Sequence, residues 1–293
     1  MRVAIQGEPG SNSHLATKAL LGEPDLLPCS LTAEVFERLA STKEADAAIL
    51  PMENSLHGAV ADHSDLLLEH GVSIVGEVSL RIRHALMVAK GVELQDVRQV
   101  FSHPVALSQC RRFFATHTLQ SVSFYDTAGA VKHVVQANLR DAAALAAPYA
   151  AEVYGADILL RDLEDDPLNF TRFFLLTRRE DAERLRPAGI PANKMSIGFD
   201  LPHQPGSLQQ ALALLAAEGA DLTRIESRPV PGRPWEYMFF VDMRVSSDPA
   251  ADAIVAVLKR ICRSATELGR YVAAEPVEAA GDEFTPSAAA GRS

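Results

Sequence analysis

The sequence predicts an α/β protein with two units, a larger one in which strands and helices alternate and a smaller one with the order βαββαβ. Three observations support this prediction. The chain has 293 residues, more than one ordinary core holds. Strand and helix patterns alternate up to about residue 178, and a charged, proline-bearing stretch follows at residues 179–193. We therefore expect a first domain at 1–178, a linker at 179–193 and a second domain at 194–272.

The composition of the chain indicates which partners, disulfides and metals to expect. Hydrophobic residues make up 47% and charged residues 23%, and the formal net charge is -10. An acidic chain without a basic run predicts no nucleic-acid or membrane partner. The three cysteines are far apart, and the nine histidines lack metal-ligand spacing, so we expect neither disulfides nor a metal. The N-terminus has no signal-peptide pattern, which predicts a cytoplasmic protein.

The first element is a strand at residues 2–6, followed by a glycine-containing turn and a helix. The turn lacks the GxGxxG and Gly-Lys-Ser/Thr patterns of nucleotide-binding loops. Free N–H groups at the helix start, near Ser11, could hold a carboxylate. A plain capped turn explains the same residues equally well.

A second strand is expected at residues 46–50, ended by Pro51. Glu53, Asn54 and Ser55 then form a polar loop before a helix at about 60–70. Ligands bind at the carboxyl ends of strands in open α/β sheets, so this loop is a candidate site. The alternative is a capping loop, since Asn and Ser both cap helices well.

The middle of the chain repeats the pattern of strand, polar turn and helix, and forms a second lobe at about 79–160. His103 and Thr127 follow two of its strands. Expected strands lie at residues 72–77, 82–89, 100–103, 122–125, 142–146 and 158–160, and helices at 105–114 and 147–154.

Residues 169–176 form an apolar, aromatic-rich run that predicts a buried strand. Thr171 can hold its hydroxyl rigidly because a β-branched side chain is stiff. Arg172 should point to the opposite face, because side chains alternate along a strand. A strand whose polar residues merely reach solvent is the simpler reading. The polar turns would line one cleft if they converge: Ser11, Asn54, His103, Thr127 and Thr171.

The second unit begins with alternating apolar residues at 197–201. A helix opens at 205–207 and carries Leu208 on its apolar face. Further strands are expected at 221–226, 236–242 and 268–272, with a helix over 254–261. This order gives the βαββαβ sandwich, and the tail at 273–293 is expected to be disordered.

Six motifs in this order resemble the prephenate dehydratase family, and the match runs from residue 3 to about 272. One short motif would be weak support, whereas six with a fitting second unit are specific. The motifs are residues 6–11, 51–55, 102–104, 125–129, 169–174 and 225–229.

The resemblance implies a two-lobed catalytic domain like type II periplasmic binding proteins, with the site between the lobes. It also implies a C-terminal ACT domain that binds phenylalanine and inhibits the enzyme. By resemblance, Thr171 is catalytic, and Glu53 is the candidate proton donor because a carboxylic acid with a raised pKa donates better than an alcohol. The expected substrate-binding residues are Asn54, Ser55, Arg172, Phe173, Ser11 and Thr127. The expected phenylalanine-binding residues are Gly206, Ser207, Leu208, Glu226, Ser227, Arg228 and Pro229.

The function implied is the decarboxylating dehydration of prephenate to phenylpyruvate in phenylalanine biosynthesis, by a homodimer or homotetramer assembled through the ACT domain. Aromatisation drives this reaction, so no cofactor is expected. One departure is Val105, where the family often has Gln after His-Pro. Two alternatives stay open, an arogenate dehydratase and a non-catalytic amino-acid sensor.

Overall fold

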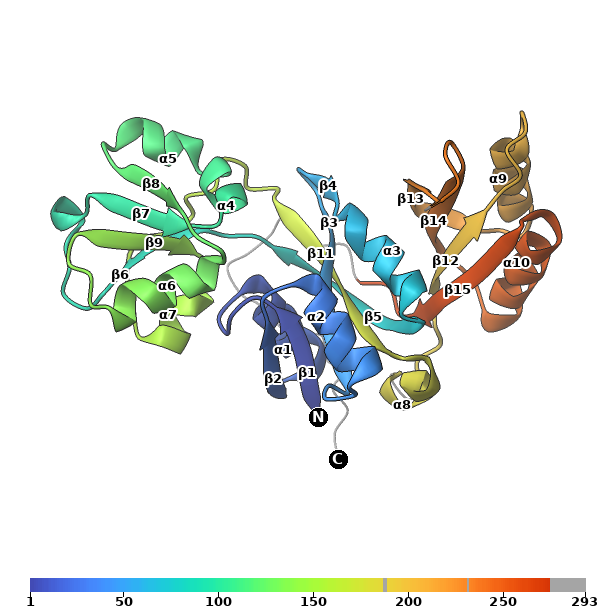
Figure 1. The fold of residues 1–293 in the computed structure, drawn as a ribbon, viewed down its shortest axis with the longest axis horizontal. Helices are drawn as coiled ribbons and strands as arrows, with labels where there is room; N and C mark the ends of the chain where they lie inside the picture. Colours follow the sequence, from blue (N-terminus) through green and yellow to red (C-terminus); the bar gives the residue numbers. More distant parts are fainter. Residues whose placement is uncertain (187–188, 231, 275–293) are drawn as a thin grey trace.

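A computed structural model describes residues 1–186, 189–230 and 232–274, so the predicted disordered tail lies almost entirely outside the described residues. Three sheets lie in a row, with the first sheet in the middle of the molecule (Figure 1). Residues 2–178 supply the strands of the first two sheets, and residues 194–271 supply those of the third. No described helix is both long and apolar enough to cross a membrane.

The first sheet has the order β2-β1-β3-β11-β5, with a short strand β4 (Gly58–Ala59) beside β3. The parallel strands β2 and β3 flank β1, and β11 runs antiparallel between β3 and β5. The strand bounds are β1 (Arg2–Gln6), β2 (Asp25–Cys29), β3 (Ala47–Asn54), β5 (Val72–Arg81) and β11 (Phe170–Arg178).

Two details of this sheet differ from the sequence prediction. The strand β2 was not predicted, and it contains Pro28, which an edge strand tolerates because its N–H need not join the ladder. The strand β3 does not end at Pro51 but continues to Asn54, paired with β11. Glu53 and Asn54 therefore belong to a strand, and their side chains point to opposite faces.

Helices cover both faces of the first sheet. The helix α1 (Asn12–Leu21) packs over Phe173 and Leu175. The other face meets α2 (Thr32–Phe36), a π-helical turn (Glu37–Ser41) and α3 (Ala61–Glu69).

The second lobe has the sheet order β10-β6-β9-β7-β8. All five residues of β9 are buried because helices cover both of its faces. The predicted helix at 105–114 is two helices that break near Cys110. The chain enters this lobe after β5 and returns before β11, so two crossings join the two lobes, as the resemblance implied. The bounds are β6 (Ala85–Val88), β7 (Gln99–Ser102), β8 (Gln120–Ser123), β9 (Ala142–Ala146), β10 (Asp157–Leu160), α4 (Pro104–Ser108), α5 (Arg111–Thr116), α6 (Thr127–Gln136) and α7 (Tyr149–Tyr154), with a 3₁₀ turn at Leu94–Asp96.

The third sheet is antiparallel with the order β13-β14-β12-β15, and two helices cover one of its faces. This confirms the βαββαβ prediction. The predicted linker contains a 3₁₀ turn (Arg179–Asp181) and a short helix, α8 (Ala182–Leu185). The bounds are β12 (Lys194–Asp200), α9 (Ser207–Ala217), β13 (Asp221–Pro229), β14 (Tyr237–Arg244), α10 (Asp248–Ile261) and β15 (Ser264–Tyr271).

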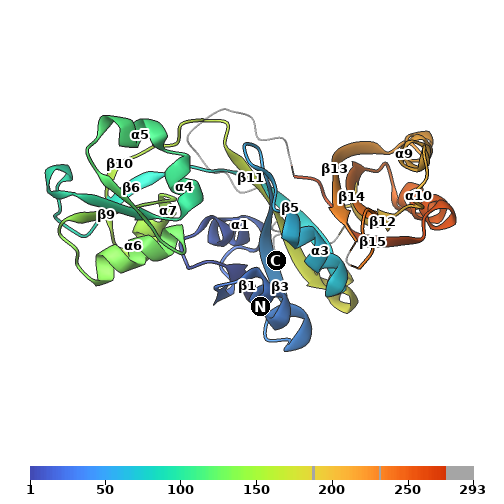
Figure 2. The same cartoon turned by 45° about the horizontal axis from the view of Figure 1, so that its top comes forward.

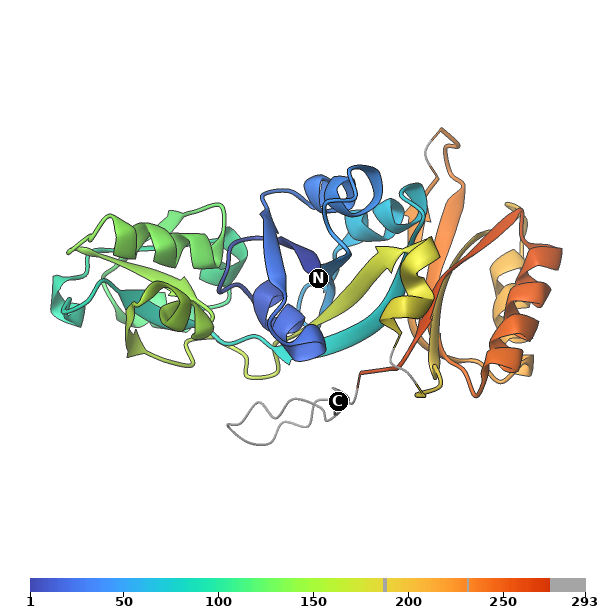
Figure 3. The same ribbon diagram turned by 90° about the horizontal axis from the view of Figure 1, so that it is seen from below.

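The uncovered face of the third sheet packs directly on the first lobe. Phe240, Leu268 and Tyr271 join the same buried cluster as Val72 and Ile74 of β5. The helix α3 lies between the two sheets (Figure 2), and β5 lies against β15 (Figure 3). The third unit is therefore packed against the first lobe and is not merely tethered to it by the linker.

Candidate active site

Thr171 and Asn54 form a hydrogen-bonded pair on adjacent strands. They stand opposite each other in the ladder of β11 and β3. The Asn54 amide nitrogen lies 3.0 Å from Thr171 Oγ1, 2.8 Å from Asn169 Oδ1 and 3.1 Å from the Phe170 carbonyl. Because the Thr171 oxygen accepts from Asn54, its own hydrogen remains available to a substrate. Of the five polar turns expected to line one cleft, the structure therefore places those at Asn54 and Thr171 side by side.

The loop after β3 is tied down by two side chains. Asn54 Oδ1 accepts from the backbone N–H groups of Leu56 (3.0 Å) and His57 (3.1 Å), as in an Asx turn. Ser55 Oγ donates to the Leu168 carbonyl at 2.8 Å and accepts from Phe170 N at 2.9 Å. Both functions of the Ser55 hydroxyl are therefore used, and its role here is to join the segments before β11 and after β3 rather than to bind substrate.

A polar chain continues from this pair into the second lobe. His57 Nδ1 lies 3.1 Å from Asn54 Oδ1 and 3.3 Å from the Gln109 amide nitrogen. Gln109 Oε1 in turn lies 2.9 Å from His84 Nε2. Burial lowers the pKa of His84, which favours its neutral imidazole. The sequence analysis missed Gln109 and His84, because neither lies in a turn directly after a predicted strand.

Asn169 is a second residue that the prediction left without a role. It is fully buried, its Oδ1 accepts from Asn54, and its Nδ2 has no hydrogen-bond partner among the described residues. His103, by contrast, has a structural role, since its side chain caps α4 by accepting from Val105 N.

The structure contradicts two predicted site residues, Glu53 and Arg172. They pair with each other at 2.8 Å on the face of the sheet opposite Thr171 and Asn54. The second guanidinium contact of Arg172 is Asp242 of β14, also at 2.8 Å. Alternation along β3 and β11 separates these charges from the hydroxyl. Glu53 is therefore not placed to protonate a leaving group beside Thr171, nor Arg172 to hold a substrate carboxylate there.

The structure also contradicts the prediction that Phe173 binds substrate. Only 2% of it is exposed, and it packs in the core between the first sheet and α1. A residue buried at this position cannot form an apolar wall for a substrate.

Ser11 and Thr127 lie where the two lobes meet. Ser11 is buried and caps α1 by accepting from His14 N, and Thr127 is the first residue of α6. A Cβ on Gly7 would lie 2.7 Å from an Asp126 carboxylate oxygen and 3.6 Å from Ser11 Cβ, so the two helix starts are close. Among the described residues, neither Ser11 nor Thr127 hydrogen-bonds to the Thr171 pair.

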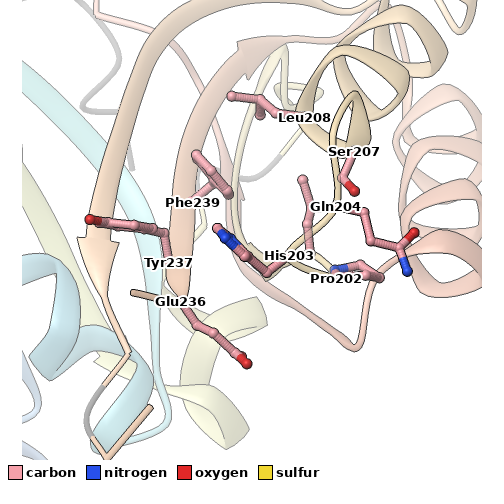
Figure 4. Close-up of a pocket in the computed structure, with 9 residues that line it drawn as sticks. Pro202, His203, Gln204, Ser207, Leu208, Glu236, Tyr237 and Phe239 are labelled. Atoms are coloured by element: carbon pink, nitrogen blue, oxygen red, sulfur yellow. The ribbon is translucent and has the colours of Figure 1, made fainter. Parts of the chain in front are cut away.

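The third unit contains a cavity of about 160 Å³ beside the start of α9 (Figure 4). Ser207 and Leu208, two of the predicted effector residues, line it. Gly206 caps α9 with φ of +85°, a conformation that suits glycine. The remaining lining residues are Leu201, Pro202, His203, Gln204, Glu236, Tyr237 and Phe239.

The other predicted effector residues lie on β13, and two of them point away from this cavity. Glu226 accepts from Ser64 Oγ of α3 at 3.0 Å, and Arg228 pairs with Asp65 of α3 at 2.8 Å. Their side chains dock the third sheet onto the catalytic lobe instead of lining the cavity. Ser227 stands opposite Phe239 and Pro229 opposite Tyr237 in the ladder, so this end of β13 adjoins the cavity wall.

A family model described as prephenate dehydratase matches residues 3–181, which contain both lobes and the Thr171 pair. The chain belongs to the prephenate dehydratase family. A curated relative, arogenate dehydratase/prephenate dehydratase 2 of Arabidopsis thaliana, is 38% identical over 281 residues, which cover 92% of this chain and 72% of the relative. The chain is accordingly a dehydratase, a carbon–oxygen lyase that acts on prephenate or arogenate.

Two solved structures resemble the whole chain. Prephenate dehydratase from Arthrobacter aurescens, in complex with L-Phe, has 30% identity and a TM-score of 0.81, covering 96% of this chain and 93% of that one. GqqA, described as a novel type of quorum quenching acylase, has 34% identity and a TM-score of 0.82, covering 94% of this chain and 99% of that one. The same architecture is therefore reported with two activities.

Proposed function

We propose that this chain is a prephenate dehydratase in which the Thr171 hydroxyl donates a hydrogen bond to the departing ring hydroxyl. The observation that carries the proposal is the 3.0 Å contact in which the Asn54 amide donates to Thr171 Oγ1. This contact fixes the position of Thr171 Oγ1. The hydrogen of the Thr171 hydroxyl can then point toward the substrate. Accepting one hydrogen bond also strengthens the donor character of the hydroxyl.

The reaction needs little more than this from the protein. The electron pair of the bond to the ring carboxylate moves into the ring as carbon dioxide leaves. The electron pair of the ring C–O bond departs with the hydroxyl, which becomes water on protonation. A threonine alcohol is too weak an acid to give up its proton fully, so its contribution is stabilisation of charge on the leaving oxygen. The proton itself must come from another donor or from water.

The choice between prephenate and arogenate depends on the group next to the pyruvyl carboxylate. Arogenate carries an ammonium group where prephenate has a keto oxygen, and a buried ammonium needs a carboxylate partner. We propose prephenate because the family model that matches this chain is described as prephenate dehydratase, and a direct comparison of the two substrates decides between them.

The carboxylate on the pyruvyl side chain requires a separate anchor. With Arg172 committed elsewhere, the N-terminus of α1 at Ser11, facing the start of α6 at Thr127, is the site we propose. The dipole of α1 favours an anion at Ser11, while the Asp126 carboxylate already caps α6 by accepting from Gly129 N. The ring carboxylate should be held less firmly, because gripping it equally would stabilise the ground state.

We further propose that L-phenylalanine is an effector bound by the third unit, with residues 1–178 as the catalytic domain and 194–272 as an ACT regulatory domain. The A. aurescens relative, which is similar along nearly its whole length, was solved with L-Phe. The cavity lined by Ser207 and Leu208 is the proposed binding site for L-phenylalanine. Assembly as a homodimer or homotetramer through this domain, and a cytoplasmic location, remain predictions.

One experiment tests the main proposal. The purified chain is incubated separately with prephenate and with arogenate, and phenylpyruvate and phenylalanine formation are followed with and without added L-phenylalanine. We expect phenylpyruvate from prephenate, and loss of turnover in Thr171→Val by a factor of about 10² or more. Faster turnover of arogenate would assign that substrate instead. Binding of phenylalanine without either product would indicate a sensor.

The acylase similarity gives a second candidate that the same preparation can address. The 34% identity over 99% of GqqA supports testing hydrolysis of acylated amines in parallel. Acyl cleavage that survives Thr171→Val, without any dehydratase activity, would contradict our proposal.

A further inference from the structure

Arg172 lies at the junction of the catalytic lobe and the third sheet. Its guanidinium contacts Glu53 of β3 at 2.8 Å, Glu77 of β5 at 3.4 Å and Asp242 of β14 at 2.8 Å. Only 12% of the Arg172 side chain and 2% of each of the Glu77 and Asp242 side chains is exposed. We name these four residues the Arg172 cluster. The charges of Arg172, Glu77 and Asp242 are largely shielded from water, so they depend on one another for neutralisation, whereas 39% of the Glu53 side chain is exposed.

Asp242 is fixed within its own unit before it reaches Arg172. Its Oδ1 accepts from Ser196 Oγ of β12 at 2.7 Å, and Ser196 also lies 2.7 Å from the Tyr271 hydroxyl of β15. Three strands of the third sheet therefore set the position of this carboxylate. A shift of the third sheet must move Asp242 or break these bonds.

The position of Glu77, which contacts Arg172, is likewise fixed by a residue of the third unit. Lys194, the first residue of β12, binds both oxygens of Glu77 at 2.8 and 2.9 Å. Both Glu77 and Asp242 thus have partners in both domains, and Asp242 also lies 3.7 Å from the Arg224 guanidinium of its own unit. The cluster couples the two domains by charge as well as by apolar packing.

The Arg172 cluster is directly connected to the catalytic pair through the backbone. In the ladder of β3 and β11, Thr171 stands opposite Asn54, and the next pair is Arg172 opposite Glu53. Neighbouring residues on a strand point to opposite faces. The same two backbone segments therefore present the hydroxyl and amide to the site on one face, and the ion pair to the third sheet on the other.

We propose that Asp242 of the third unit is a positioning residue for dehydration. Its carboxylate holds Arg172, and through the backbone of β11 it fixes Thr171 against Asn54. The inference rests on the proposed function of Thr171. It also gives the effector a route to the reaction, because movement of the third sheet on binding L-phenylalanine would reach Thr171 through one side chain and one peptide unit.

The test uses the full chain and prephenate turnover. Asp242→Asn keeps the shape of the side chain but removes its charge. We expect kcat to fall about tenfold or more, because small misplacements of a catalytic group are costly, while KM changes less than twofold. The control is Asp252→Asn, which neutralises a carboxylate on α10 that pairs with Arg270 at 2.7 Å on the surface. The control should stay within twofold of the parent in both constants.

A second variant covers the case in which Asp242→Asn does not fold. Ser196→Ala keeps every charge, loosens Asp242 and also removes the hydrogen-bond partner of the Tyr271 hydroxyl. It should lower kcat in the same direction with KM unchanged. On a Thr171→Val background, Asp242→Asn should change the residual kcat less than twofold, because its effect acts through Thr171.

The outcomes separate this inference from the proposed function. If Thr171→Val lowers turnover but Asp242→Asn and Ser196→Ala match the Asp252→Asn control, the positioning role is refuted and the proposed function stands. If Thr171→Val itself turns over prephenate like the parent, the proposed function fails. A tenfold loss in Asp242→Asn that vanishes on the Thr171→Val background supports the inference.

Discussion

Gly269 of β15 packs directly against the backbone of Ile74 in β5, and replacing it with alanine should separate the third sheet from the catalytic lobe. A Cβ at this position would lie 2.0 Å from the Ile74 carbonyl oxygen and 2.8 Å from both Ile74 C and Ile74 N. Ordinary van der Waals contact begins at 3.4 Å, so the two backbones would have to part by 1.4 Å (3.4 minus 2.0). The obstructing atoms are backbone, and no side-chain rotation relieves the clash.

The expected cost follows from this geometry. Overpacking a well-packed contact typically costs about 1–3 kcal/mol, and here the displacement also loosens Tyr271 and Leu268, which are buried against β5. We expect the free energy of unfolding to fall by about 3 kcal/mol or more. The same displacement would stretch the 2.8 Å contact between Arg172 and Asp242, so kcat should fall as well.

Urea denaturation followed by circular dichroism gives the free energy, and prephenate turnover gives kcat. Gly219→Ala is the matched control, because Gly219 lies in the same unit with φ of +76° and no atom within 4 Å of a built Cβ. It should cost only the backbone strain of about 1 kcal/mol. Equal losses in the two variants would refute the reasoning, because they would show that β15 does not press on β5.

Three further outcomes are expected. Asn54→Ala should lower kcat on prephenate about 10²-fold, because it removes the amide that orients Thr171. An unchanged kcat would show that the contact between Asn54 and Thr171 has no role in catalysis. Burial raises the pKa of Asp126, which caps α6 by accepting from Gly129 N. Its contribution to stability is complete below the unfolded pKa and is lost as pH rises through the raised folded pKa, so the parent should lose stability relative to Asp126→Asn in thermal melts as pH rises above 3.8, the ordinary value. Burial lowers the pKa of His63 below its ordinary value of 6.5. NMR titration should show this, and the parent should lose stability relative to His63→Gln as pH falls from 6.5; a His63 pKa above 6.5 would contradict it.

Much of the fold could be predicted from sequence, because periodic apolar runs report local structure directly. Two of the exceptions involve proline, and a third is the predicted helix at 105–114, which breaks near Cys110. A proline reads as a strand breaker, yet Pro28 lies in an edge strand and Pro51 inside β3, where tertiary pairing overrides the local signal. Because β3 extends past Pro51 to Asn54, the residues directly after Pro51 form a strand and not the predicted loop.

The site was predicted only in part for a related reason. Thr171 and Asn54 were identified correctly as neighbours, but Glu53 was assigned to a loop, where alternation does not apply. Once it lies on a strand, it must face away from Asn54. Asp242, one of the partners of Arg172, lies 70 residues further along the chain, and no local sequence pattern predicts a contact at that separation. Long-range ion pairs between domains are visible only after the fold is assembled.

The strand β11, which lies between β3 and β5 in the first sheet, is synthesised after the entire second lobe. The strand β5 ends at Arg81 and β11 begins at Phe170. Until β11 leaves the ribosome, β3 and β5 have no shared neighbour, and each has an unpaired edge of the kind that pairs with other chains. The first sheet, and with it the contact between Thr171 and Asn54, is therefore completed only after the second lobe has been made.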